Sequence, residues 1–188
     1  MAKASIEIRD CLSVAAKTNA LVRIDRSIKR ADRLEGYLVG LGRRWALLQL
    51  VSHDWLLNGY GAIRVGDVKR VRRWDDRSDF PARALAHFDQ TALPIPGIEL
   101  DSVRSLIESA AQRSPLVTVF VEDARPDVCF VGRALSVSDR RLRLSEIDPG
   151  AVWKHEPTKL DLRDVTRVEF GGRYEEALAA LAGGSKGI

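Results

Sequence analysis

The sequence predicts a mainly β protein with flanking helices, built as an internal duplication of two α-β5-α units. Three observations carry this prediction. Short apolar runs rich in Val, Ile and Leu recur along the 188 residues, as is typical of strands. Three blocks of sequence occur twice, and an internal repeat of this kind determines the architecture of the whole chain. A stretch with two prolines and a glycine separates the two copies.

The duplication rests on blocks that appear in the same order in both copies. They are residues 35–51 and 131–147, residues 62–71 and 159–168, and residues 8–22 and 103–117. The first pair aligns Gly36 with Gly132, 96 residues further on, and the second aligns Asp67 with Asp164, 97 residues further on. We therefore place repeat one at residues 1–90, a linker at 91–97 and repeat two at 98–188.

Each repeat is predicted to begin with an amphipathic helix. In repeat two, Val103, Leu106, Ile107 and Ala110 follow the spacing of one helix face, with Asp101 or Ser102 as the cap. In repeat one, Ile8, Leu12, Ala15 and Ala16 follow the same spacing. A second short helix is expected to close each unit, at residues 80–88 and 174–182.

Between these helices we expect five strands in each repeat. They are residues 20–26, 34–42, 44–52, 61–66 and 68–74 in repeat one, and 115–122, 127–138, 141–147, 158–163 and 165–170 in repeat two. The connections at 43–44 and 139–141 are short and charged, which favours exposed hairpin turns.

A helix followed by five short strands, with a brief interruption before the fifth, resembles the Sm-like (SH3-like) small β-barrel family. The resemblance is carried by Gly36 and Gly132 in the second strands and by the strings IRVGDVKRV (63–71) and LDLRDVTRV (160–168). It implies two tandem small barrels. The family's RNA-binding signature, an Asp followed closely by an Asn, has no counterpart in either hairpin, so uridine recognition of that type is not expected.

The charge is unevenly distributed over a chain with a net charge of +4. Residues 1–94 contain 17 Lys and Arg against 11 Asp and Glu, whereas residues 95–188 contain 13 against 15. The candidate basic rim of repeat one consists of Arg30, Arg33, Arg43, Arg44, Arg70, Arg72 and Arg73. Such a rim can hold phosphates without reading sequence. The alternatives are a solvated surface balanced by Asp25, Asp32, Asp75, Asp76 and Asp79, or a face that binds an acidic partner.

Corresponding loops in the two repeats carry Trp55 with Tyr60, and Trp153. Aromatic residues in such loops either close the end of a barrel or contact proteins or stacked bases. We take these three residues as the first candidates for a binding surface. The two loops also differ most between the repeats, as if each copy meets a different partner.

Catalytic chemistry has little support in the sequence. His53 with Asp54, and His155 with Glu156, offer too few ligands for zinc, and a solvated polar loop is the simpler interpretation. No catalytic triad order, phosphate-binding loop or zinc-protease motif occurs. Asp67 is expected to cap a turn through its side chain. We expect no enzyme activity, no metal and no cofactor.

Two further features concern the environment of the chain. No apolar run approaches the roughly 20 residues that a bilayer-spanning helix needs, and no charged-then-apolar leader begins the sequence, so we expect a cytoplasmic protein without membrane contact. Cys11 and Cys129 lie in apolar contexts, so we expect both to be reduced and buried.

These observations predict a non-catalytic binding or assembly module that acts by protein–protein interaction. Its partner is an unknown protein or a second copy of the chain. RNA binding through the basic rim of repeat one is the alternative. Because small barrels leave strand edges open, we also expect edge pairing, either between the repeats or between chains.

Overall fold

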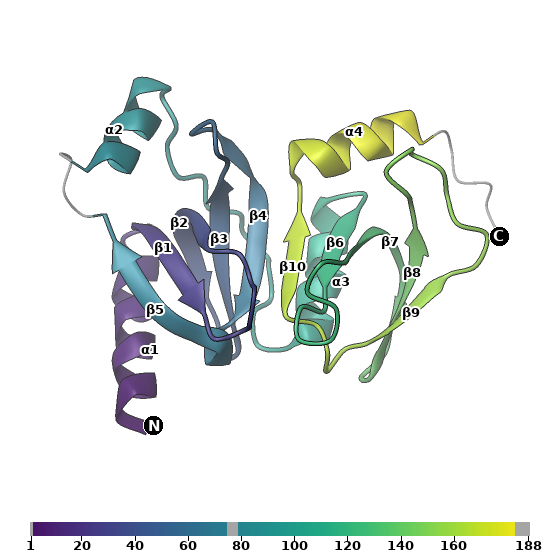
Figure 1. Cartoon of the computed structure of the whole chain (residues 1–188), viewed down its shortest axis with the longest axis horizontal. Coiled ribbons are helices and arrows are strands. Elements are labelled where there is room, and N and C mark those ends of the chain that lie inside the picture. The colour runs from purple at the N-terminus through teal and green to yellow at the C-terminus, as the bar shows by residue number, and fades with distance from the viewer. Residues whose placement is uncertain (1, 75–78, 183–188) are drawn as a thin grey trace.

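One antiparallel sheet of ten strands, with four α-helices, makes up the part of the chain that this computed structural model describes, residues 2–74 and 79–182 (Figure 1). The first half contains α1 (Ala2–Lys17), β1 (Leu21–Arg26), β2 (Leu34–Leu41), β3 (Trp45–Val51), β4 (Leu57–Arg64), the short 3-10 turn η1 (Val65–Asp67), β5 (Val68–Arg73) and α2 (Phe80–His87). The second half contains α3 (Val103–Arg113), β6 (Val117–Phe120), β7 (Cys129–Val137), β8 (Arg141–Glu146), β9 (Thr158–Asp161), β10 (Arg167–Phe170) and α4 (Arg173–Leu181). A mainly β fold with flanking helices is thereby confirmed.

The helices follow the apolar spacing and the end signals of the sequence. In α3 the predicted face is buried through Leu106, Ile107 and Ala110, and the N-cap residue is Ser102, whose side chain accepts a hydrogen bond from the N–H of Ser105. Pro81 lies in the first turn of α2, where its missing N–H costs no helical hydrogen bond. Helix α3 therefore begins where its cap satisfies a free backbone N–H, and α2 begins where its proline removes one.

The order of the strands is β5-β1-β2-β3-β4-β10-β6-β7-β8-β9. In each half, the strand that comes last in the sequence lies first in the sheet, and the other four strands follow it in their sequence order. Strand β4 of the first half pairs with β10 of the second, from Ile63 opposite Arg167 to Tyr60 opposite Phe170. We call this junction the seam. The expected edge pairing thus occurs within the chain, and β5 and β9 remain as the two outer strands.

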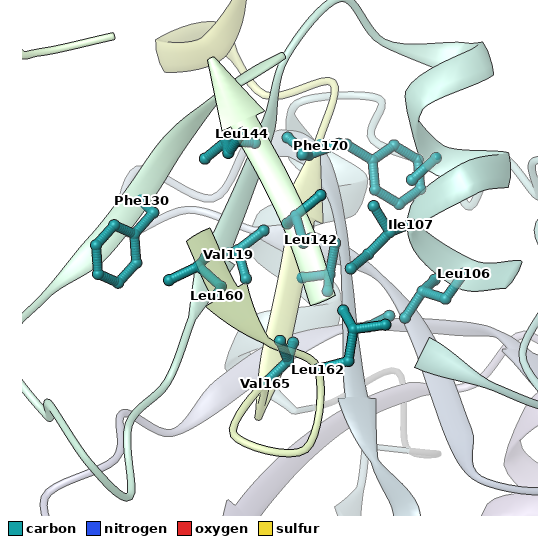
Figure 2. Close-up of a cluster of buried hydrophobic side chains, with 14 of the residues drawn as sticks. Leu106, Ile107, Val119, Phe130, Leu142, Leu144, Leu160, Leu162, Val165 and Phe170 are labelled. Carbon is teal, nitrogen blue, oxygen red and sulfur yellow. The ribbon is translucent and has the colours of Figure 1, made fainter. Parts of the chain in front are cut away.

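Two hydrophobic clusters fill the halves, and they meet at the seam. The first lies beneath α1 and contains Leu12, Ile24, Leu38, Leu48 and Ile63, among others. The second contains Ile107, Val119, Leu142 and Phe170, as Figure 2 shows, together with residues of the first half, namely Trp45, Leu47 and Ala62. Because each large buried side chain contributes about 1.5–3 kcal/mol, this shared cluster ties the halves together.

Residues 98–101 of the chain, just after the linker, are docked rather than free. The carbonyl of Leu100 accepts a hydrogen bond from the N–H of Trp45 at 3.0 Å, and the carboxylate of Asp101 accepts one from the N–H of Arg43 at 2.7 Å. The side chain of Leu100 also packs against the second cluster. The β2–β3 hairpin of the first half is therefore held against the segment that leads into the second.

A glycine occupies the same place in the second strand of each half. A Cβ atom on Gly36 would lie 2.2 Å from the carbonyl oxygen of Gln49, and one on Gly132 would lie 2.1 Å from that of Ser145. A register shift follows two to four residues later in both strands. The missing side chain therefore permits a close approach that bends β2 over β3 and β7 over β8.

Several strand limits differ from the predicted ones by two residues or more, and two of these differences have a clear local cause. Strand β4 begins at Leu57 rather than residue 61, because Leu57 pairs with Val51 beyond an irregularity in the register. The two glycines of this segment interrupt the apolar pattern, so the sequence did not predict a strand there. Strand β6 ends at Phe120 rather than residue 122, because the N–H groups of Ala124 and Arg125 both donate to the carbonyl of Val121 and form a turn. Tertiary pairing and turn formation decide both limits.

Three sequence predictions about single residues need correction. Cys129 is exposed, because its neighbour Phe130 points into the core and side chains alternate along β7, and Cys11 is only partly buried. The turn at Asp67 is closed by the N–H of Val68, which donates to the carbonyl of Val65, and the carbonyl of Asp67 accepts from the N–H of Ser27. The Oδ2 atom of Asp67 is buried without a hydrogen bond from any described residue. Burial raises the pKa of Asp67. No helix of the described residues is long and apolar enough to cross a membrane.

Candidate binding site at the seam

A buried ion network lies at the seam and joins the two halves. The guanidinium of Arg26, at the end of β1, donates to both carboxylate oxygens of Glu122, with Nη1 to Oε2 at 2.5 Å and Nη2 to Oε1 at 2.7 Å. Thr166 donates a third hydrogen bond to this carboxylate at 2.7 Å. Burial alone would raise the pKa of Glu122, but the hydrogen bonds from Arg26 and the charge of Arg167 outweigh it and hold that pKa below its usual value.

A cavity of about 810 Å³ opens next to this network. Its walls come from β4, β6 and β10, from parts of β1, β2, β3 and β7, from the β1–β2 and β3–β4 loops, and from the start of α4. Four carboxylates and three guanidiniums line it: Asp32, Glu35, Glu169 and Glu175, and Arg23, Arg33 and Arg167. A concave site of this size between two packed halves is a common location for a ligand.

Arg167 forms one side of the cavity and is 6% exposed. Its guanidinium carbon lies 3.6 Å from the centre of the Phe120 ring, and its Nε atom is 3.4 Å from Oε1 of Glu169. That Nε atom is buried and has no hydrogen-bond partner among the residues described. The guanidinium is thus neutralised by carboxylates near it, but its hydrogen-bonding capacity is not used in full.

Glu169 and Glu175 lie in the same cavity and influence each other. Burial raises the pKa of Glu169 to about 7, which the positive charge of Arg167 opposes and the negative charges of Glu175 and Glu122 increase. Glu175 is itself buried in the first turn of α4, and its carboxylate accepts a hydrogen bond from Thr118. The carboxyl group of Glu169 therefore titrates around neutral pH.

This raised pKa makes stability depend on pH. The folded state of Glu169 binds its proton more tightly than the unfolded state, whose pKa is near 4.5, so this contribution is complete below about pH 4.5 and is lost as the pH rises through about 7. We expect Glu169→Gln to be more stable than the wild type by about 1–3 kcal/mol above pH 8. Urea unfolding of both proteins at several pH values measures this difference. A difference that does not change with pH would contradict the raised pKa.

Aromatic side chains complete the walls. The ring of Tyr60 stacks on that of Phe170 with 5.6 Å between centroids, and its hydroxyl donates to the carbonyl of Leu93 at 2.7 Å. Trp55 has a positive φ of 61° and places its ring edge-on to Phe80 at 5.3 Å. Both residues line the cavity, so the structure brings two of the three predicted aromatic candidates to the seam.

Trp153, the third candidate, lies apart from this site. It packs against the buried cluster of Leu116, Val131, Ile147 and Leu178, and its indole N–H donates to the carbonyl of Ala182 at 3.2 Å. The guanidinium of Arg133 lies 5.6 Å from the centre of its ring. Trp153 therefore closes the end of the second half.

The predicted basic rim is spread over three elements. In the β1–β2 loop, Arg30 pairs with Asp127 of the second half at 3.0 Å and Arg33 pairs with Asp25 at 3.2 Å. The β2–β3 hairpin carries Arg43 and Arg44, and β5 carries Arg70, Arg72 and Arg73. Of the proposed balancing carboxylates, Asp75 and Asp76 lie outside the described residues. Arg30 and Arg33 are thus already paired with carboxylates.

The outer strand β5 presents a different surface. Lys69, Arg70 and Arg72 are exposed along it, and none of the three has a carboxylate within 4.0 Å in the part of the chain that is described. The guanidinium of Arg72 lies 6.0 Å from the centre of the Trp74 ring, over which Arg23 also lies, at 5.0 Å. On its inner side β5 pairs with β1, and its outer side has no partner strand among the described residues.

The residues at the centre of the cavity were not singled out by the sequence analysis. Arg167, Glu169 and Thr118 alternate with apolar residues in β10 and β6, which is the ordinary pattern of a strand with one wet face. In the folded chain β10 pairs with β4 on one side and with β6 on the other, and only this pairing makes its polar face a wall of the cavity. The two histidine loops, by contrast, form no group of three potential metal ligands within the described ranges.

In comparisons with known proteins, no family model, no curated protein and no solved structure matches the chain. The function is therefore argued from the two surfaces described above.

Proposed function

We propose that the chain is a non-catalytic protein-binding module, made of two duplicated Sm-like small barrels, that binds an acidic extended segment of its partner along β5. The observation that carries this proposal is the outer strand β5, with its unpaired edge and its exposed basic side chains. An extended peptide can add to such an edge as a further strand.

The duplication is supported by the correspondence between the halves. Their strands occur in the same order in the sheet, and each half begins with a helix that packs on its own hydrophobic cluster. Gly36 and Gly132 meet the carbonyls of corresponding residues, Gln49 and Ser145, at nearly the same distance. Such a close approach at equivalent positions is what a duplication predicts.

The two outer strands offer different chemistry to a partner. Strand β5 presents six residues, with Lys69, Arg70 and Arg72 exposed, so an added strand rich in Asp and Glu is attracted to it. Strand β9 has only four residues and follows Pro157, which has no N–H to donate to a neighbouring strand.

A second copy of the chain fits this edge less well than an acidic segment does. Pairing β9 of one copy with β5 of another, in the manner of the seam, brings Lys159 close to the basic side chains of β5. Charged side chains on outer strands, especially Lys, are a common protection against pairing between copies. We therefore expect the purified protein to be monomeric.

RNA is the alternative partner, because phosphates are also attracted to Arg70 and Arg72 and to Arg43 and Arg44 of the hairpin. The two partners differ in what they require. Strand addition depends on the free backbone edge of β5, whereas phosphate binding depends only on the positive charge and falls steeply with salt.

The test compares two charge reversals of equal size. The edge variant is Arg70→Glu with Arg72→Glu on β5, and the control is Arg141→Glu with Arg143→Glu, which are also exposed but lie on β8, a strand paired on both sides. A fluorescent peptide in which Glu alternates with Val is the probe, and binding is followed by anisotropy. We expect the edge variant to bind at least about tenfold more weakly and the control variant to bind within about twofold of the wild type.

Two results would overturn this proposal. Equal losses in the two variants would show that charge alone attracts the peptide. Binding of a single-stranded oligo-uridine, with a steep dependence on salt and without binding of the peptide, would assign the surface to RNA instead.

A further inference from the structure

We propose that the seam cavity binds a small organic cation, an ammonium or guanidinium group carried on an aromatic or aliphatic body. This inference concerns a different surface from the β5 edge and does not depend on the proposed protein partner. It rests on the shape of the cavity, on the balance of charges in its walls and on its aromatic side chains.

The cavity has the size and the location of a ligand site. Its volume of about 810 Å³ falls within the range of roughly 300–1,000 Å³ that small-molecule sites occupy. Its walls come from both halves, which are held together by the shared hydrophobic cluster and by the bond between Arg26 and Glu122. The cavity is therefore formed before a ligand arrives.

The charges in the walls leave an excess of carboxylate. Arg23 is paired with Glu35 at 2.6 Å, and Arg33 is paired with Asp25, which does not line the cavity. Arg167 is shared among three carboxylates, at 3.4 Å from Glu169, 3.7 Å from Glu122 and 3.9 Å from Asp32. Glu175 has no cation within 4.0 Å among the described residues, although it is only 6% exposed.

Arg167 is a cation in the cavity wall, next to which a bound cation has to be accommodated. This side chain is more than nine-tenths buried, lines the cavity and has a buried Nε without a partner in the described chain. A cation bound between Glu169 and Glu175 draws Glu169 toward itself and weakens its contact with Arg167, which is now 3.4 Å long. The guanidinium then turns more fully to Glu122, with which it already shares the seam network.

The aromatic rings favour a cation with an apolar body. Tyr60 and Phe170 form a stacked pair at one wall, Phe120 lies under Arg167, and Trp55 closes the rim. Aromatic faces attract ammonium and guanidinium groups as well as hydrocarbon. Carboxylates beside aromatic faces are therefore complementary to an amine on a hydrophobic body.

The proton on Glu169 gives the inference a measurable consequence. At neutral pH this carboxyl holds a proton for part of the time, since burial and the neighbouring negative charge of Glu175 both favour the neutral form while Arg167 opposes it. A bound cation replaces that proton. Binding of a cation should therefore release protons near pH 7 and become tighter as the pH rises.

The experiment uses three probes that share a phenyl ring and differ in charge: phenethylamine, phenethyl alcohol and phenylpropionate. Each is titrated into the full chain by calorimetry at about pH 5.5 and about pH 8.5, and near pH 7 in two buffers with different ionisation enthalpies. We expect phenethylamine to bind at least about tenfold more tightly than phenylpropionate, to gain about tenfold between the two pH values and to release protons.

Matched variants test whether phenethylamine binds in the cavity. Glu169→Gln keeps the size of the side chain and should remove the pH dependence and the proton release, whereas Glu108→Gln, at an exposed site on α3, should leave both unchanged. Thr118→Val tests Glu175 through its hydrogen-bond donor and should also weaken binding of phenethylamine. Thermal unfolding of each variant shows whether it remains folded.

The possible outcomes divide clearly. Preference for phenethylamine that is lost in Glu169→Gln supports the inference. Equal affinity for the three probes, tighter binding of phenylpropionate, no binding of any probe, or a preference that Glu169→Gln leaves intact would each overturn it. The edge variant Arg70→Glu with Arg72→Glu should bind phenethylamine as the wild type does, so failure of the proposed function and failure of this inference are distinguishable.

Discussion

Replacing Glu122 by Gln is expected to destabilise the protein by about 3–5 kcal/mol. The side chain of Glu122 is 4% exposed, and its carboxylate accepts hydrogen bonds from Arg26 across the seam and from Thr166 of its own half. Without its charge, the buried guanidiniums of Arg26 and Arg167 lose their shared counter-ion and remain away from water. Urea unfolding monitored by circular dichroism measures the loss.

Two comparisons test that explanation. Asp127→Asn breaks the exposed pair with Arg30, whose side chains are 63% and 69% exposed, and should change stability by no more than about 1 kcal/mol. The double variant Arg26→Met with Glu122→Leu should recover part of the loss, because Arg26 is then no longer a buried unpaired charge, while Arg167 keeps Glu169 as a counter-ion. If Glu122→Gln were as mild as Asp127→Asn, the ion network would not be what holds the seam.

Gly132→Ala is expected to cost about 3 kcal/mol, and Gly36→Ala a similar amount. The added Cβ atom would lie 2.1 Å from the carbonyl oxygen of Ser145 in the first variant and 2.2 Å from that of Gln49 in the second. Because the obstacle is backbone of a neighbouring strand, relief requires the strands to move apart and lose hydrogen bonds. Denaturant unfolding gives the difference in free energy.

Gly66→Ala is the matched control for these two variants. Gly66 lies in the turn η1, and a Cβ atom there meets nothing within 4 Å. We expect this change to alter stability by no more than about 0.5 kcal/mol. Equal effects of Ala at residues 36, 66 and 132 would mean that the bend of the second strands does not depend on glycine.

Most elements of the fold were predictable from local patterns. The apolar spacing of Leu106, Ile107 and Ala110 and the cap at Ser102 are properties of neighbouring residues, and the structure has helix α3 where they place it. The hairpin at 43–44 lies between β2 and β3 as expected. Where a limit depended on a partner strand, as for Leu57 at the start of β4, the local pattern was insufficient.

The candidate site was predictable only in part. Trp55 and Tyr60 were chosen as loop aromatics and do line the seam cavity, whereas Trp153, chosen for the same reason, closes the end of the second half. The basic residues were predicted to lie together on one rim of the first barrel. The folded chain instead pairs Arg30 with Asp127 and leaves the β5 residues on a separate edge.

The sequence by itself determined the helices and the approximate positions of the strands, because these depend on residue spacing along the chain. Only the tertiary structure decided that β4 pairs with β10, and with it where the charged residues of β10 lie. Arg167 and Glu169 have the same alternating pattern as any half-exposed strand, and it is the strand on each side that excludes water from them. Burial is a property of the assembled chain, so the raised pKa of Glu169 and the charge balance of the cavity arise only after folding.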